Sequence, residues 1–277
     1  NRAEFLLDAL ESARGQTRLP DEIFVSDDMG SDEVRKLVFE FGNSISVPVS
    51  YSHCTSGQNQ VENVNHCFRS ARSDLILLLH DDDLLMPRAG ECLRQPFLED
   101  DSLVATYGKQ VTMTDGGEDL SSDTFNQKYH RTPAHAGVQP DAFVAGIRQQ
   151  FPNDGYMVRA SVAQKVLLRH SAGGAADFDF GLRLSETGRF FFLDEFTAKY
   201  RFSAESVGRG AGARTDDSAL VAVRISRGLL KSHPQYAGEI NNAIRRLSPT
   251  ALRMALKQGA LGEAIGLYFG PHYPRGF

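Results

Sequence analysis

The stretch "LILLLHDDDLLMP", Leu75–Pro87, joins an apolar run to three consecutive carboxylates. Such a run predicts a buried strand, as in parallel sheets that are covered on both faces. His80 and Asp81–Asp83 follow at the carboxyl end of that strand. Ligands of open α/β sheets bind outside the carboxyl ends of the strands, so this acidic cluster lies where a site is expected.

Three adjacent carboxylates need something that balances their charge. Crowded acids repel one another and take up protons unless a cation lies between them. Hard oxygen ligands favour Mg²⁺ or Mn²⁺, ions that also bind substrate phosphates. The sequence therefore predicts a divalent-metal site, and the alternative is a solvated acidic turn. His80 is either a further ligand, which suits Mn²⁺ better than Mg²⁺, or a structural residue at the strand end.

The segments before this stretch alternate between helix and strand patterns. Helices are predicted at 1–13, 31–42 and 60–71, and strands at 21–28 and 47–54. Strands that alternate with helices of this length indicate right-handed βαβ units. The predicted fold class is therefore α/β, with a doubly wound sheet.

The segments after it extend this fold and add a helical end. The patterns predict a helix at 87–97, a strand at 103–113, a polar loop at 114–139, helices at 140–151, 161–170 and 177–188, a strand at 155–160, and a strand pair within 189–203. A loop as long as 114–139 is usually functional or mobile. From about 216 the pattern is helical, so we expect a first domain over 1–213 and a C-terminal helical extension over 214–277.

Composition excludes several classes of protein. The net charge of −5 argues against nucleic-acid binding, which normally needs a basic surface. The three cysteines fit neither a disulfide framework nor a zinc site, and we expect reduced thiols. No apolar run approaches the about 20 residues of a membrane span, and no signal peptide is recognisable, so a cytoplasmic protein is expected. Because the chain begins at Asn1 without Met, its natural start is expected upstream.

Two further acidic pairs are candidates for chemistry. Asp27 ends the strand predicted at 21–28, where a carboxylate can accept a hydrogen bond from a nucleobase N–H or a ribose hydroxyl; the alternative is a turn that caps the next helix. Asp177 and Asp179 begin a helix after glycines. Acids are stabilised there by the helix dipole, and a catalytic role is the alternative.

Four blocks of the chain, in this order, resemble the family 2 glycosyltransferases. They are "FLLDALESARGQTRLPDEIFVSDDMGSD", "NVNHCFRSARSDLILLLHDDDLLMP", "DFDFGLRLSETGRFFFL" and "KYRFSAESVGR". They are similar to that family's strand ending in two acids, its D-x-D-type strand end, its "ED" helix and its following Arg/Ser segment. The ordered set covers residues 1–209 and is more specific than any one block.

The resemblance implies a GT-A fold and transfer of a hexosyl group in polysaccharide or glycoconjugate biosynthesis. It also implies inversion at the anomeric carbon, a nucleotide-sugar substrate (a UDP- or dTDP-sugar), and Mn²⁺ or Mg²⁺ as the cofactor. It does not name the acceptor.

The resemblance also implies roles for single residues. Asp27 matches the acid that contacts the nucleoside, with Asp28 beside it, and Asn65 matches a helix Asn near the nucleotide. Asp81 matches the acid that contacts ribose, and Asp82 matches the metal ligand. Asp83 is left as a structural residue.

The remaining roles fall in the last two blocks. Asp177 matches the acid that serves as general base. Arg201 and Ser206 follow the predicted strand pair and are expected to contact diphosphate oxygens, the alternative being an ordinary basic surface turn.

The chain departs from the family pattern at three places. His80 stands where many members carry the first Asp of the motif, and Ala176 stands where the Glu of "ED" is usual. The strand that normally precedes "NR" is absent from the sequence. A doubly wound sheet without that strand is expected to have an uncovered interior edge.

Two other functions are compatible with the sequence. A Mg²⁺-dependent phosphotransferase or nucleotidyltransferase would also place acids around a metal, but no Gly-rich phosphate loop is present. A non-catalytic nucleotide-sugar-binding protein is the second alternative. The C-terminal helices either pack on the core, form a homodimer contact, or make a peripheral contact with the inner face of a membrane.

Overall fold

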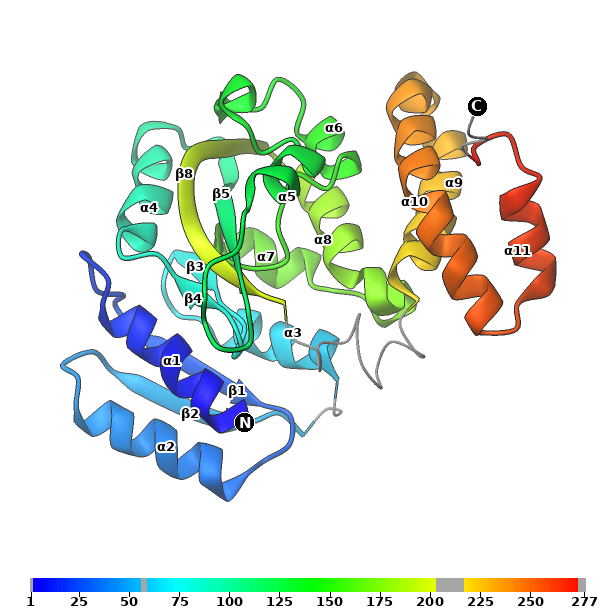
Figure 1. The fold of residues 1–277 in the computed structure, drawn as a ribbon. Coiled ribbons are helices and arrows are strands. Elements are labelled where there is room, and N and C mark those ends of the chain that lie inside the picture. Colours follow the sequence, from blue (N-terminus) through cyan, green and yellow to red (C-terminus); the bar gives the residue numbers. More distant parts are fainter. Residues whose placement is uncertain (1, 56–58, 203–216, 274–277) are drawn as a thin grey trace.

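The computed structural model describes residues 2–55, 59–202 and 217–273. Figure 1 shows a large sheet covered by helices, a small two-stranded sheet beside it, and a group of C-terminal helices on the opposite side. The fold is α/β, as the sequence predicts, and β3 (Leu75–Leu78) and β4 (Leu84–Leu85), which flank the acidic stretch, lie on the side of the large sheet toward α1 (Arg2–Arg14) and β1 (Ile23–Asp27) (Figure 1).

The small sheet is a βαβ unit. It is formed by α1 (Arg2–Arg14), β1 (Ile23–Asp27), α2 (Asp32–Asn43) and β2 (Val49–His53). β1 and β2 pair in parallel, from Ile23 opposite Val49 to Asp27 opposite His53. Buried Leu10, Val38 and Phe41 pack α1 and α2 on this sheet, since the apolar residues of each helix recur on one face.

The large sheet contains six strands among the described residues. β3 (Leu75–Leu78), β7 (Tyr156–Arg159), β5 (Leu103–Met113), β8 (Arg189–Arg201) and β4 (Leu84–Leu85) lie side by side in this order, and β6 (Gly137–Val138) also pairs with β8. Only β5 and β8 are parallel; the other pairs are antiparallel.

The predicted direction of one strand was wrong. β3 was expected to be a parallel strand, and it pairs antiparallel with β7. Its apolar run reflects burial on both faces: Ile76 and Leu78 join one core cluster, while Leu75 and Leu77 pack against another. Burial on both faces fixes the composition of a strand but not its direction. The sheet is divided, since β1 pairs only with β2 among the described residues, and this agrees with the interior edge expected without the strand before "NR".

The strand pair predicted within 189–203 is instead one long strand, β8. The residues between Phe192 and Phe196 form a bulge, because Phe192 lies opposite Tyr107 and Phe196 lies opposite Lys109. The backbone approaches closely at this bulge. A Cβ on Gly108 would lie 2.5 Å from Thr197 Cγ2, so only glycine fits there.

The segment 114–139 carries more structure than the predicted loop. It contains α5 (Asp123–Lys128), a 3₁₀ turn at Pro133–His135 and β6. The buried Asn126 side chain donates to Gln110 O over 2.8 Å and accepts from Gln110 N over 3.1 Å. β7 pairs with β5 only as far as Tyr107, so these bonds satisfy the backbone groups of Gln110 on that side of β5 and fasten the segment to the sheet.

The helices cover the sheet and connect it to the C-terminal group. Their bounds are α3 (Gln60–Ser70), α4 (Ala89–Glu99), α6 (Ala142–Ile147), α7 (Ala160–Val166), α8 (Ala176–Ser185), α9 (Ser218–Ser232), α10 (Ala237–Lys257) and α11 (Leu261–Tyr268), with 3₁₀ turns at His170–Ala175 and Pro234–Tyr236. The predicted domain boundary at 213/214 lies outside the described residues.

The C-terminal helices pack on α6 and α8. Phe143 and Leu182 join Leu220 and Ile244 in one buried apolar cluster. At its rim, Arg148 on the sheet side donates to both carboxylate oxygens of Glu239, over 3.1 and 2.6 Å. Such a bidentate pair fixes direction as well as contact, so α10 is held in one orientation against α6.

Candidate active site

The acidic loop between β3 and β4 is fastened to the end of β8. β4 pairs antiparallel with β8, with Leu84 opposite Lys199, so the following residues of β8 lie beside the acids. The backbone N–H of Arg201 donates to Asp83 Oδ1 over 2.7 Å, and Arg201 Nε donates to the carbonyl of Asp82 over 2.7 Å. These bonds fix the course of the loop that carries the predicted site.

The Arg201 guanidinium is buried and its donors are used within the protein. Nη1 donates to the carbonyl of Asp115 over 2.6 Å and to that of Thr114 over 3.3 Å, and the group lies over the Phe5 ring at 4.2 Å. Arg201 therefore joins the acidic loop, the turn after β5, and α1. A direct contact with diphosphate stays a prediction, and Ser206 lies outside the described residues.

Two buried polar atoms of the acidic cluster have no hydrogen-bond partner among the described residues. They are His80 Nε2 and Asp83 Oδ2. One ligand atom each from His80, Asp82 and Asp83 lies within 4.8 Å of the others. An unpartnered buried carboxylate oxygen is costly, and a cation at this point would relieve the cost. One imidazole and two carboxylates fit Mn²⁺ or Mg²⁺, and Asp83, taken as structural from the sequence, belongs to this group.

Asp154 is a site residue that the sequence reasoning missed. It is fully buried, its Oδ1 accepts from Gln110 Nε2 over 3.0 Å, and its Oδ2 accepts from the backbone N–H of His80 over 3.5 Å. Gln110 in turn accepts from Arg131 over 2.6 Å. In the sequence, Asp154 directly precedes the strand predicted at 155–160, and this position could have marked it as a candidate. Because Asp-Gly is also an ordinary turn sequence, the position alone does not distinguish a site residue from a turn residue.

Asp83 and Asp154 form a buried carboxyl pair. Burial, and next the charge of Asp154, raises the pKa of Asp83 well above its ordinary value. Burial also raises the pKa of Asp154 to about 7. Two carboxylates this close cannot both be charged without a proton or a cation between them. The charge state of this pair therefore depends on the positive charge present in the acidic cluster.

Asp177 lies in the first turn of α8, close enough to His80 and Asp154 for their charges to interact. Burial raises the pKa of its carboxyl, and the positive form of His80 opposes that rise. Its charge also acts on Asp154. Among the described residues, none donates a hydrogen bond to the Asp177 carboxylate, whereas Arg183 Nε donates to Oδ2 of the nearby Asp179 over 2.8 Å. Asp177 and Asp179 stand at the start of α8, as the sequence predicts, and the catalytic role of Asp177 stays a prediction.

A glycine turn positions the start of α8. Gly173 has a positive φ of 47°, and Gly174 N–H donates to Asp217 Oδ1 over 2.8 Å. A Cβ on Gly174 would lie 2.8 Å from that oxygen, so the close approach needs glycine. The turn ties the N-terminus of α8 to the N-terminal end of α9.

Asp27 ends β1, as the sequence predicts, and holds the turn that follows. Its Oδ1 accepts from Met29 N over 2.9 Å, and its Oδ2 accepts from Ser31 N over 2.8 Å and from the Tyr51 hydroxyl over 2.9 Å. Burial alone would raise the pKa of Asp27, but these hydrogen bonds outweigh it and the pKa is lowered. The backbone of Gly30 contributes to this lowering as well, and a contact of Asp27 with a nucleoside stays a prediction. Asp28, half-buried, is adjacent.

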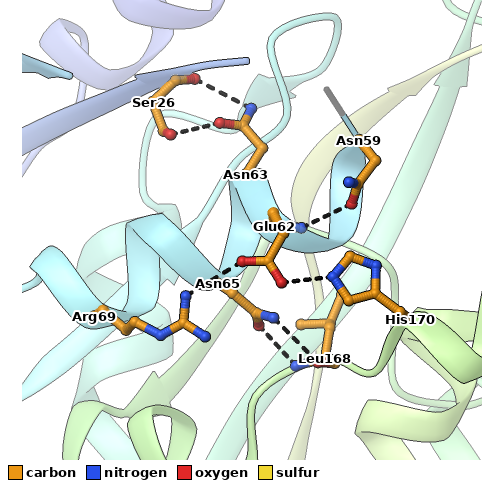
Figure 2. Close-up of polar contacts among 8 residues, drawn as sticks. All are labelled: Ser26, Asn59, Glu62, Asn63, Asn65, Arg69, Leu168 and His170. Atoms are coloured by element: carbon orange, nitrogen blue, oxygen red, sulfur yellow. Dashed lines mark hydrogen bonds and ion pairs between the residues drawn. The ribbon is translucent and has the colours of Figure 1, made fainter. Parts of the chain in front are cut away.

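Polar side chains of α3 connect β1 to the chain before α8 (Figure 2). The Asn65 amide donates to Leu168 O over 3.1 Å and accepts from Leu168 N over 2.7 Å, and the residue is buried. Glu62 bonds to His170 at 2.5 Å, and Asn63 bonds to both the hydroxyl and the carbonyl of Ser26. Asn65 thus links two elements that carry site residues, and its contact with a nucleotide stays a prediction.

The fold and the acidic site define a class, the GT-A glycosyltransferases. Among solved structures, S. aureus TarS 1–349 in complex with UDP-GlcNAc is similar, with a TM-score of 0.60 and 13% identity over 96% of this chain and 86% of that chain. The same protein in complex with UDP has a TM-score of 0.58 and 15% identity, over 97% of this chain and 86% of that chain. The mannosyltransferase PcManGT from Pyrobaculum calidifontis, in complex with GDP-Man and Mn²⁺, has a TM-score of 0.58 and 13% identity, over 98% of this chain and 78% of that chain.

The sequence itself matches the family model for glycosyl transferase family 2 over residues 1–156. The chain belongs to this family. No curated protein matches it. Among the described residues, no helix is long and apolar enough to cross a membrane.

Proposed function

We propose that this glycosyltransferase moves a hexosyl group from a nucleotide-diphosphate sugar to an acceptor hydroxyl, with inversion and with Asp177 as general base. One observation supports the proposal: Asp177, far from the acidic loop in sequence, lies close enough to His80 for their charges to interact, and His80 belongs to the group with Asp82 and Asp83. Inverting transfer needs a base and a charge-stabilising group on opposite sides of the reacting carbon.

Asp177 is suited to take a proton. Its pKa is raised by burial, so its carboxylate is a stronger base than an ordinary aspartate. It accepts the acceptor hydroxyl proton while the hydroxyl oxygen attacks the anomeric carbon. The bond from that carbon to the diphosphate oxygen breaks, and its electron pair leaves with the diphosphate. This single displacement inverts the anomeric configuration.

Asp82, Asp83 and His80 would hold the divalent cation. When bound, Mn²⁺ or Mg²⁺ supplies positive charge for the diphosphate. The unpartnered His80 Nε2 and Asp83 Oδ2 support this assignment, and one similar structure contains Mn²⁺ together with a nucleotide sugar. Arg201 acts as a positioning residue, since its short bonds to the carbonyls of Asp82 and Asp115 hold the loop in place.

The nucleoside end of the substrate is assigned to the turn after β1. Asp27 is the candidate for the base, Asp28 lies beside it, and Asp81 is the candidate for the ribose. Similar structures carry UDP, UDP-GlcNAc and GDP-Man, which supports a nucleotide sugar, and we take a UDP- or dTDP-sugar as the first candidate. Family membership does not favour the phosphotransferase alternative.

The variant Asp82→Ala tests the cation assignment. It removes one carboxylate of the group without disturbing Asp83, whose Oδ1 stays bonded to the backbone. Calorimetric titration with UDP-sugars and dTDP-sugars, with and without Mn²⁺, should show metal-dependent affinity in the parent and none in the variant. Asp32→Ala, an exposed acid on α2, is the matched control. Equal affinity with and without Mn²⁺ in the parent would sink the assignment.

A further inference from the structure

The C-terminal helix α11 presents an apolar face that no described segment covers. Leu261, Ile265 and Tyr268, with the following Phe269, are exposed, and Phe269 is 68% exposed. Their spacing of four, three and one residues places them on one side of the helix. Ala264 and Leu267 lie on the other side and join the buried cluster with α9 and α10. We call the four exposed residues the α11 face.

A face of this kind is unusual for a surface helix. Single exposed apolar residues are ordinary, but large apolar side chains gathered on one surface mark an interaction site. The α11 face lies on the outer side of α10, at the end of the molecule opposite β1 and β2 (Figure 1). It is therefore separate from the acidic site.

The surroundings of this face are basic. The last turns of α10 expose Arg253 and Lys257, with exposed Leu256 between them. The acid of α11, Glu263, is neutralised by two bonds from Arg224, of 2.7 and 2.6 Å. Residues 217–273 contain seven Lys and Arg against three Asp and Glu, in a chain with a net charge of −5. Arg246 is held inward by its bonds to the carbonyls of Lys128 and Arg148, but the segment still carries an excess of positive charge, which complements an anionic surface.

The aromatic residues favour a lipid surface over a protein partner. The ring of Tyr268 lies 5.0 Å from that of Phe269 and 5.1 Å from that of Tyr273. Tyrosine places an apolar ring and a polar hydroxyl at the depth of lipid headgroups. A second copy of the chain docked face to face would instead bring the two basic rims together, which is repulsive.

We propose that the α11 face, with Arg253 and Lys257, docks the protein onto the surface of an anionic membrane. The apolar side chains enter the boundary between headgroups and acyl chains, and the cations contact lipid phosphates. The helix lies on the bilayer rather than across it, which agrees with the finding that no described helix is long and apolar enough to cross a membrane.

Vesicle flotation tests this proposal. The full chain is mixed with vesicles of phosphatidylcholine and phosphatidylglycerol in equal parts, or of phosphatidylcholine alone. We expect flotation with the anionic vesicles, and a loss of about tenfold or more in partitioning for Ile265→Ser combined with Phe269→Ser. Arg253→Glu combined with Lys257→Glu should also abolish flotation, and added salt should weaken it in the parent.

Matched controls come from the opposite end of the molecule. Phe39→Ser and Lys36→Glu on α2 change residues of similar exposure and should leave flotation unchanged. Binding of nucleotide sugars should be unchanged in all variants, because none of these residues belongs to the acidic site. Failure of the proposed function would therefore be seen separately.

Three results would overturn the proposal. The parent fails to float with anionic vesicles, or the Ile265→Ser and Phe269→Ser variant floats like the parent. In the third, light scattering finds a parent dimer that this variant loses, which would make the α11 face a contact between copies.

Discussion

Replacing Arg201 with Ala should destabilise the fold strongly, because its side chain carries two short charged hydrogen bonds. Nε lies 2.7 Å from the carbonyl of Asp82, and Nη1 lies 2.6 Å from that of Asp115. A hydrogen bond from a charged group contributes about 1.5–3 kcal/mol. With the lost contact to the Phe5 ring, we expect the free energy of unfolding to fall by about 3–5 kcal/mol.

Urea denaturation followed by circular dichroism measures this change, with the m-value required to stay constant. The control is Arg189→Ala at the other end of β8, where the side chain is exposed and paired with Asp100 at 2.9 Å. An exposed pair contributes at most about 1 kcal/mol. A loss below about 1 kcal/mol for Arg201→Ala, with nucleotide-sugar affinity lost instead, would refute the positioning role and support direct contact with diphosphate.

Two further predictions concern buried polar groups. Because the folded-state pKa of Asp154 is raised to about 7, its contribution is fully present below the unfolded-state pKa and is lost as pH rises through the folded one. Melting temperature in EDTA should therefore fall between about pH 4 and about pH 7, less so in Asp154→Asn, and Mn²⁺ should reverse the fall; a flat profile in the parent would contradict the carboxyl pair. Asn65→Ala should cost about 2–4 kcal/mol in urea denaturation, because Leu168 loses both partners in a buried place. Normal stability with lost nucleotide binding would instead favour the nucleotide contact.

Much of the fold and part of the site could be predicted from local patterns. The acidic stretch, the strand ending in Asp27 and the acid at the start of α8 follow from spacing alone, and the structure has them at those places. The family resemblance is confirmed by the match to glycosyl transferase family 2.

The remainder depends on contacts between distant residues. Strand direction for β3 could not be predicted, because the apolar run is the same for a parallel or an antiparallel strand. The bonds from Arg201 to the acidic loop span more than a hundred residues, so no local pattern contains them. In the sequence Asp154 is typical of a turn residue, and its role becomes clear only from its hydrogen bonds with the distant Gln110 and His80.

The most direct test of the central claim is the turnover of Asp177→Asn with a nucleotide sugar that the parent uses. If Asp177 is the general base, kcat should fall by about 10²- to 10⁴-fold, while nucleotide-sugar affinity in the presence of Mn²⁺ stays at the parent value. A kcat within about tenfold of the parent would contradict the claim and leave Asp177 as an acid that caps α8.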